Sequence, residues 1–181
     1  MNQGLIPKRY AKALYEFAAE QGNDSQVYAV MRTLEQSFEA NPELQKALAN
    51  PFVSPADKAA LIRTAAGVDA KPGVLTDFLE LLKRNERFGL TRGIALAYCD
   101  IYRKAHSIDV VRVVSAAPLD PATESRLKSI IAAHLGAHTM EYSSGVDPEL
   151  IGGFTVQTGN TRLDASVANE LKQLRLNLIS K

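Results

Sequence analysis

The residues whose types could do chemistry stand apart from one another in this sequence. His134 and His138 have an i, i+4 spacing that can hold a metal, but neither they nor His106 has a Cys or carboxylate at metal-ligand spacing. His134 falls near the apolar stripe of its predicted helix, which favours a partly buried histidine. Cys99 has no nearby histidine or helix N-terminus to lower its pKa, so we expect an inert thiol. The sequence therefore predicts no catalytic residue, no metal and no cofactor.

Four glycines, at positions 145, 152, 153 and 159, could form a loop that binds phosphate. Such a loop needs a Lys-Ser or Lys-Thr pair and a helix N-terminus after it, whereas these glycines precede predicted strands. The pattern favours turns and close backbone packing instead.

The composition excludes several classes of protein. With 181 residues, 46% hydrophobic and 23% charged, the chain has the make-up of a soluble globular protein of one domain or two small ones. A net charge of +1 gives no argument for nucleic-acid binding. The single cysteine excludes an internal disulfide and fits a reducing compartment. No apolar run approaches the roughly 20 residues that span a bilayer, so we expect a cytosolic protein that reaches a membrane only through partners.

Six helices are predicted in the first part of the chain, joined by short loops that carry proline or glycine. Their approximate ranges are 7–21, 24–40, 42–49, 55–66, 72–87 and 89–106. Apolar residues repeat at helical spacing through them, which predicts an antiparallel-type bundle.

The first and fifth of these helices carry apolar stripes that are wider than a small bundle needs. The stripes are about 140° and about 160° wide at ~100° per residue, whereas a peripheral helix usually buries about 100°. Two explanations remain open. Either both helices are sandwiched within the bundle, or a groove between them receives an amphipathic helix of a partner.

A modest basic cluster surrounds the turn between the fifth and sixth helices. It consists of Lys83, Arg84, Arg87 and Arg92. Helical RNA-binding regulators use such patches, so an RNA-binding regulator with an appended α/β domain is the alternative function. Acidic neighbours dilute the cluster and aromatic residues are sparse there, which favours a solvated surface.

After Ser107 the pattern changes to that of strands. Residues 108–115 are mostly β-branched and apolar on both faces, which predicts an interior strand. In residues 139–143 polar and apolar side chains alternate, which predicts an edge strand. Residues 154–158 and 161–164 predict a hairpin with a Gly159-Asn160 turn, followed by a helix capped by Asp164 or Ser166. The order β-α-β-β-β-α predicts a small α/β domain, and the whole chain an α+β fold with domains at 1–106 and 107–181.

Three motifs give the chain a resemblance to a known family along nearly its whole length. They are residues 9–14 (RYAKAL), 81–88 (LLKRNERF), and 147–154 (DPELIGGF) followed by 163–167 (LDASV). The chain resembles the delta subunit of proton-translocating ATP synthase, the family of the oligomycin-sensitivity-conferring protein. Ala165 departs from the family pattern, which usually has glycine there, and this alters the entrance to the last helix slightly.

The resemblance implies two docking sites and no catalysis. The helical domain would bind N-terminal helices of the alpha subunits in a groove between the first and fifth helices. The candidate groove residues are Tyr10, Ala13, Leu14, Phe17, Val74, Phe78 and Leu81. The second domain would dock the b subunits of the peripheral stalk. The candidate residues there are Gly152, Gly153, Phe154, Asp164, Leu171 and Leu174.

The function that this resemblance implies is mechanical. A non-catalytic stator subunit would connect the catalytic head to the membrane-anchored stalk, so that rotor torque is coupled to ATP synthesis and proton transport. It would lie at the cytoplasmic face of the bacterial inner membrane, held there by partner subunits, with no nucleic-acid partner and no direct membrane insertion.

Overall fold

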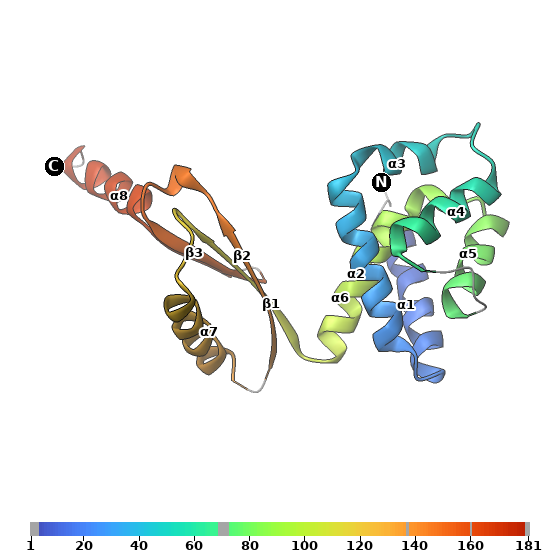
Figure 1. The fold of residues 1–181 in the computed structure, drawn as a ribbon, viewed down its shortest axis with the longest axis horizontal. Helices are drawn as coiled ribbons and strands as arrows, with labels where there is room; N and C mark the ends of the chain where they lie inside the picture. The colour runs from blue at the N-terminus through green and yellow to red at the C-terminus, as the bar shows by residue number, and fades with distance from the viewer. Residues whose placement is uncertain (1–3, 69–72, 137, 160, 180–181) are drawn as a thin grey trace. The chain divides into compact units, whose positions relative to one another are not determined.

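The protein is described by a computed structural model over residues 4–68, 73–136, 138–159 and 161–179. It divides into two compact units, Met1–Ala105 and His106–Lys181 (Figure 1). Over the described residues the first unit contains six α-helices, and the second contains a mixed sheet with helices. The predicted α+β class, with a helical N-terminal part and a smaller α/β part, is therefore confirmed.

The helices of the first unit begin and end close to the predicted positions. They are α1 (Leu5–Glu20), α2 (Asp24–Ala40), α3 (Pro42–Ala49), α4 (Pro55–Ala66), α5 (Val74–Arg84) and α6 (Thr91–Ala105), with a 3₁₀ turn, η1 (Phe88–Leu90), before α6. The Ser54 hydroxyl caps α4 by accepting the Asp57 N–H at 3.1 Å. Gly67 ends the same helix in the left-handed region, at a φ of 66°.

One helix is shorter than its sequence pattern predicts. The fifth helix was expected to run to about residue 87, but α5 ends at Arg84 because Glu86 adopts a φ of 53°. Glu86 N–H donates to the Lys83 carbonyl at 3.2 Å and Arg87 N–H donates to the Leu82 carbonyl at 2.9 Å. This is a Schellman ending with glutamate where glycine is usual, so the residue types gave no stop signal. The expected start at residues 71–72 lies outside the described residues.

The core of the first unit lies between α1, α2 and α6, with α3, α4 and α5 packed around them. Tyr28 and Tyr102 stack with ring centroids 4.1 Å apart, and Tyr15 meets Tyr98 edge to face at 6.0 Å. The Tyr98 hydroxyl donates to the Asp24 carbonyl at 3.1 Å. These contacts fix α1, α2 and α6 together, so α1 presents a defined outer face.

The sheet of the second unit has the strand order β2-β1-β3-β4. The strands are β1 (Ile108–Ser115), β2 (Thr139–Val146), β3 (Gly153–Thr158) and β4 (Thr161–Ser166). A crossover helix, α7 (Pro121–Leu135), joins the parallel pair β1 and β2, while β3 pairs antiparallel with both β1 and β4. The predicted interior strand and edge strand are confirmed, although β2 is three residues longer than expected.

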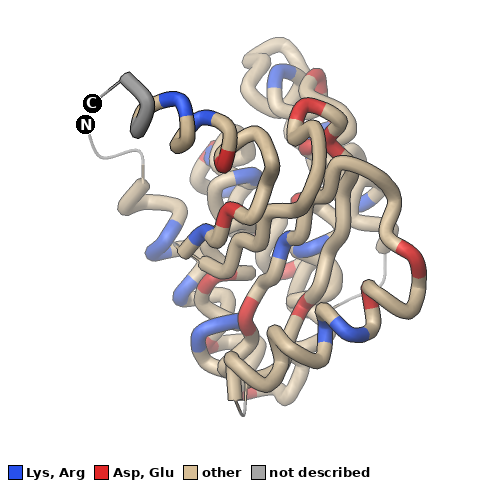
Figure 2. The backbone as a smooth tube through the Cα atoms, turned by 90° about the vertical axis from the view of Figure 1, so that its left-hand side faces the viewer, with Lys and Arg blue, Asp and Glu red and all other residues tan. Residues whose placement is uncertain are grey.

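One face of this sheet carries the core of the second unit. Val111 and Val113 of β1 are fully buried there with Val156 of β3, and Ile131 of α7 packs on them. A helix, α8 (Val167–Ile179), follows β4 and packs at its start against β4 and a 3₁₀ turn, η2 (Pro148–Leu150). Basic and acidic residues are interspersed along the backbone instead of being gathered by sign (Figure 2). Among the described helices, none combines the length and apolarity needed to cross a membrane.

Candidate functional site

A groove lies between α1 and α5 of the first unit. Its volume is about 440 Å³. The residues that line it are Ile6, Arg9, Tyr10, Ala13, Leu81, Asn85 and Arg87. Three of the seven candidate groove residues, Tyr10, Ala13 and Leu81, are therefore in its lining. Leu81 is 42% exposed, so a large part of its side chain is open to a partner.

The structure divides the remaining candidates between surface and core. Phe17 is 40% exposed and continues the line of Tyr10 and Ala13 along α1. Leu14, Val74 and Phe78 are buried in the bundle. These three residues have almost no surface to offer a partner, so we assign them to core packing. The surplus width of both stripes arises because each helix has core residues on one side and groove residues on the other.

Two groove residues that sequence reasoning did not select are cationic. Arg9 and Arg87 are exposed and line the groove together with the apolar side chains. Arg9 lies about 40° from Ala13 at ~100° per residue, at the edge of the groove face of α1, but the candidates were chosen from the apolar stripe, so a charged residue was passed over. Arg87 lies beyond the end of α5, and only the Schellman turn brings it to the groove. The groove therefore suits an amphipathic helix with apolar residues next to acidic ones.

A second candidate surface lies at the end of the second unit. Leu171 and Leu174 of α8 were predicted to belong to it, and they are 52% and 56% exposed. Val167, at the start of α8, is exposed on the same helical face, at i, i+4, i+7 spacing with the two leucines. Phe154, another candidate, is partly buried against the core of the sheet, and we assign it to packing.

The glycines Gly152 and Gly153 hold the start of α8 close to the hairpin. A Cβ at Gly152 would lie 2.9 Å from Cγ2 of Val167. Gly153 has a φ of 74°, and a Cβ there would overlap the Ala165 carbonyl and lie 3.1 Å from Cα of Ser166. Both positions therefore require glycine, one for close packing and the other also for its backbone conformation.

Ile151, just before these glycines, has a strained backbone that sequence reasoning did not find. Its φ is 64° and its ψ is −41°, and Gly152 N–H donates to the Leu150 carbonyl at 2.6 Å across it. This is a γ-turn of the rare, strained hand, centred on a β-branched residue. Such a conformation costs about 1–3 kcal/mol. The Ile151 side chain is nevertheless 69% exposed, so its own packing within the chain offsets little of that strain.

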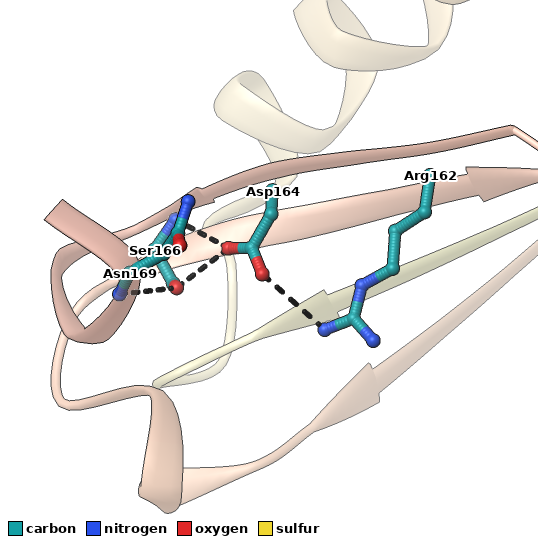
Figure 3. A network of polar contacts seen from close by, with 4 residues as sticks. All are labelled: Arg162, Asp164, Ser166 and Asn169. Carbon is teal, nitrogen blue, oxygen red and sulfur yellow. Dashed lines mark hydrogen bonds and ion pairs between the residues drawn. The ribbon is translucent and has the colours of Figure 1, made fainter. Parts of the chain in front are cut away.

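A chain of polar contacts connects β4 to the first turn of α8 (Figure 3). Asp164 accepts hydrogen bonds from the Ser166 hydroxyl at 2.6 Å and the Ser166 N–H at 3.1 Å, and Ser166 Oγ accepts the Asn169 N–H at 3.2 Å. Ser166 is thus the cap of α8, and Asp164 orients it. The hydrogen bond from the Ser166 hydroxyl has the largest effect on the pKa of Asp164 and lowers it below the ordinary value. The hydrogen bond from the Ser166 N–H and the charge of Arg162, 3.5 Å away, lower this pKa further.

We expect this network to make the second unit sensitive to acid. Because the folded-state pKa of Asp164 is lowered, its stabilising contribution is complete above the ordinary value of 3.8 and is lost as pH falls through the folded value. Asp164→Asn should therefore lower stability near neutral pH but flatten its fall as pH drops below 3.8. Thermal melts of both proteins across this range provide the measurement. Parallel stability curves for the two proteins would contradict the assignment.

The histidines that the sequence offered as possible metal ligands do not form a site among the described residues. The His134 side chain is exposed, so the prediction of a partly buried histidine was wrong. The apolar stripe of α7 is centred on Ile131, and at about 100° per residue His134 lies about 60° from it. His138 contacts Asp109, with Nδ1 and Oδ2 2.7 Å apart, a carboxylate that lies 29 positions away in sequence. Within the described ranges no three His, Cys, Asp or Glu residues are grouped as a metal site would need.

Cys99 is fully buried in α6, and burial raises the pKa of its thiol to about 12. Since the thiolate is the reactive form, we expect the folded protein to resist labelling by a thiol reagent at neutral pH. Labelling should become rapid, by at least about a hundredfold, once denaturant unfolds the bundle. Time-resolved labelling with and without denaturant measures this ratio. Rapid labelling of the folded protein would show that α6 opens readily.

Comparison with known proteins identifies the family to which the sequence is similar. A family model described as "ATP synthase delta (OSCP) subunit" matches residues 6–178. The chain is 41% identical over 182 residues to the ATP synthase subunit delta of Bacteroides thetaiotaomicron, covering 100% of this chain and 97% of that one. It is 39% identical over 179 residues to the ATP synthase subunit delta of Parabacteroides distasonis, covering 99% and 98%.

A solved structure has the same fold. A chain in the cryo-EM structure of the Toxoplasma gondii mitochondrial ATP synthase hexamer superposes with a TM-score of 0.73 at 20% identity, over 96% of this chain and 97% of that chain. The fold defines a class of protein: a two-part chain with a helical bundle and a small α/β unit. The chain belongs to the ATP synthase delta (OSCP) subunit family. The comparisons support this family and not the RNA-binding alternative.

Proposed function

We propose that this chain is the non-catalytic link between the catalytic head of an ATP synthase and its membrane-anchored peripheral stalk. Membership of the family makes it a component of the peripheral stalk and a subunit of an enzyme complex that couples ATP synthesis to hydrogen-ion transport. The finer proposal assigns one partner to each unit: alpha-subunit N-terminal helices to the bundle, and b subunits to the second unit.

The observation that carries the head contact is the groove between α1 and α5. Its apolar side chains, above all Leu81 and Tyr10, remain accessible in the folded bundle, with Arg9 and Arg87 beside them. An amphipathic helix from an alpha subunit would bury its apolar face here and place acidic residues near the two arginines. Phe17 extends the same contact along α1 by about one turn beyond Ala13.

The stalk contact is assigned to the exposed face of α8. Leu171 and Leu174 are exposed leucines on one helical face, and the glycine-dependent junction at Gly152 and Gly153 fixes where this face begins. Asp164 supports the junction through the Ser166 cap and is not assigned a direct contact. The b subunits, which are anchored in the membrane, would hold the chain at the cytoplasmic face of the bacterial inner membrane.

The role of such a link is to resist torque. A rotor turning within the head would drag the head around unless a static connection holds the head to the membrane part. Both contacts must therefore dissociate slowly compared with turnover. An apolar helix seated in a groove provides this better than exposed ion pairs, each of which contributes about 0–1 kcal/mol.

Reconstitution into membranes stripped of this subunit tests the proposal. We expect ATP-driven proton pumping to be lost in the stripped membranes and restored by adding the purified chain, while ATP hydrolysis by the head continues in both cases. Restoration requires both contacts, so a chain that binds the head but not the stalk would restore nothing. Full proton pumping without the chain would refute the proposal.

A further inference from the structure

We propose that Ile151 is the anchor residue of the stalk contact. In this inference, which rests on the proposed function of the second unit, Ile151 forms one apolar surface with Val167, Leu171 and Leu174. The occupant of that surface is an amphipathic helix of the stalk b subunits. The γ-turn that strains Ile151 serves to present its side chain to this helix.

The backbone at Ile151 is difficult to explain by the fold alone. A position with a φ of 64° favours glycine or asparagine, and a β-branched residue is among the least suited to it. The turn is held on both sides, because Ile151 N–H donates to the Pro148 carbonyl at 3.1 Å and Gly152 N–H to the Leu150 carbonyl. Strained positions of this kind cluster at binding sites, where the surroundings hold them for function.

The position of Ile151 relative to α8 is also fixed. The carbonyl of the next residue, Gly152, accepts the Val167 N–H at 3.0 Å, and Val167 packs onto the Gly152 backbone so closely that a Cβ there would clash. Ile151 therefore lies beside the first turn of α8, where the apolar face of the helix begins. In the proposed contact, the same partner helix covers the exposed Ile151 side chain and the exposed face of α8.

The spacing of the apolar residues on α8 points to a helical partner. Val167, Leu171 and Leu174 are separated by four and then three positions, the d-a-d spacing of a coiled-coil seam. Glu170 and Arg175 occupy the flanking g and e positions, so a partner helix with charges of opposite sign at the facing positions is complementary. Leu176 lies off this seam, about 140° around the helix from Leu171 at ~100° per residue.

A second copy of this chain fits the surface less well. It would present only the same surface, Ile151 and the 13 residues of α8, whereas a stable interface usually needs roughly 20–30 residues a side. A long stalk helix can continue past both ends of α8 and contact Ile151 at one of them. This difference in available length favours the stalk helix as the occupant.

The test compares variants of the full-length chain in binding to a soluble b-subunit pair that lacks its membrane span. We expect Ile151→Gly to lower the affinity at least tenfold without lowering the melting temperature, since glycine removes the anchor and relieves the strain. Ile151→Val keeps a β-branched apolar side chain, so its affinity should stay within threefold of the unmodified chain. Ile130→Ala is the control, because Ile130 is a 57% exposed isoleucine on α7 of the same unit, and we expect no change in affinity.

The outcomes separate this inference from the proposed function. If the unmodified chain does not bind the b-subunit pair, the proposed function of the second unit fails. If it binds, and Ile151→Gly binds equally well, the stalk contact stands and the anchor is refuted. A fall in the melting temperature together with affinity would show a structural role for Ile151, which also overturns the inference. If the unmodified chain forms a dimer on its own and Ile151→Gly dissociates that dimer, the occupant of the surface is a second copy. This result also overturns the inference.

Discussion

Leu81→Asp is expected to lower the affinity of the chain for a synthetic alpha-subunit N-terminal peptide at least about a hundredfold, or about 2.7 kcal/mol. Burial of a leucine side chain contributes about 1.5–3 kcal/mol, and a carboxylate at the same place would have to lose its water on binding. Because Leu81 is exposed in the isolated bundle, its replacement should leave the fold intact. Isothermal calorimetry gives the affinity, and circular dichroism confirms the helical content.

The matched control is Leu61→Asp on α4. Leu61 is 38% exposed, close to the exposure of Leu81, but it does not line the groove. We expect this variant to bind the peptide normally. Equal losses in both variants would indicate a nonspecific effect of added negative charge, and unchanged affinity of Leu81→Asp would remove the groove as the binding site.

Gly153→Asp is expected to uncouple proton flow from ATP synthesis by disrupting the second unit. Any side chain at this position would overlap the Ala165 carbonyl, and the left-handed φ of 74° adds backbone strain. We expect the stability of the second unit to fall by about 3 kcal/mol or more. The hairpin and the start of α8 would then lose the geometry that the stalk contact needs, whereas the bundle would remain folded.

The measurement has two parts, one on the isolated chain and one in membranes. Hydrogen exchange should show lost protection in β3, β4 and α8 of Gly153→Ala and Gly153→Asp, with the six helices of the bundle unchanged. Membrane vesicles carrying Gly153→Asp should hydrolyse ATP without pumping protons. Gly145→Ala is the control, since a Cβ at Gly145 has no neighbour within 4 Å. Normal pumping by Gly153→Asp would show that the junction does not support the stalk contact.

Much of the fold follows from local signals in the sequence. Several helix ends were predictable from a Pro, Gly or capping hydroxyl, as at Ser54 and Gly67. The interior position of β1 followed from its valines on both faces, and the β3–β4 hairpin from its alternation. The end of α5 was not predictable, because a glutamate occupies the left-handed position of its Schellman turn.

The surfaces were harder to predict because they depend on tertiary packing. Periodicity gathered Tyr10, Leu14, Phe78 and Leu81 into wide stripes but could not separate the residues that face the core from those that face the groove. Arg87 reaches the groove through a turn, not a helix. The strain at Ile151 left no signal at all, because isoleucine is the residue type least expected at a positive φ.

The central claim is that one chain holds the head and the stalk at the same time through two independent surfaces. Size-exclusion chromatography of a labelled alpha-subunit N-terminal peptide with the soluble b-subunit pair tests it directly. We predict that the peptide elutes with the b-subunit pair only when the full-length chain is present. Leu81→Asp should remove the peptide but leave the chain on the b-subunit pair. The claim would be contradicted if the peptide and the b-subunit pair displaced one another from the chain. It would also be contradicted if the chain bound neither of them.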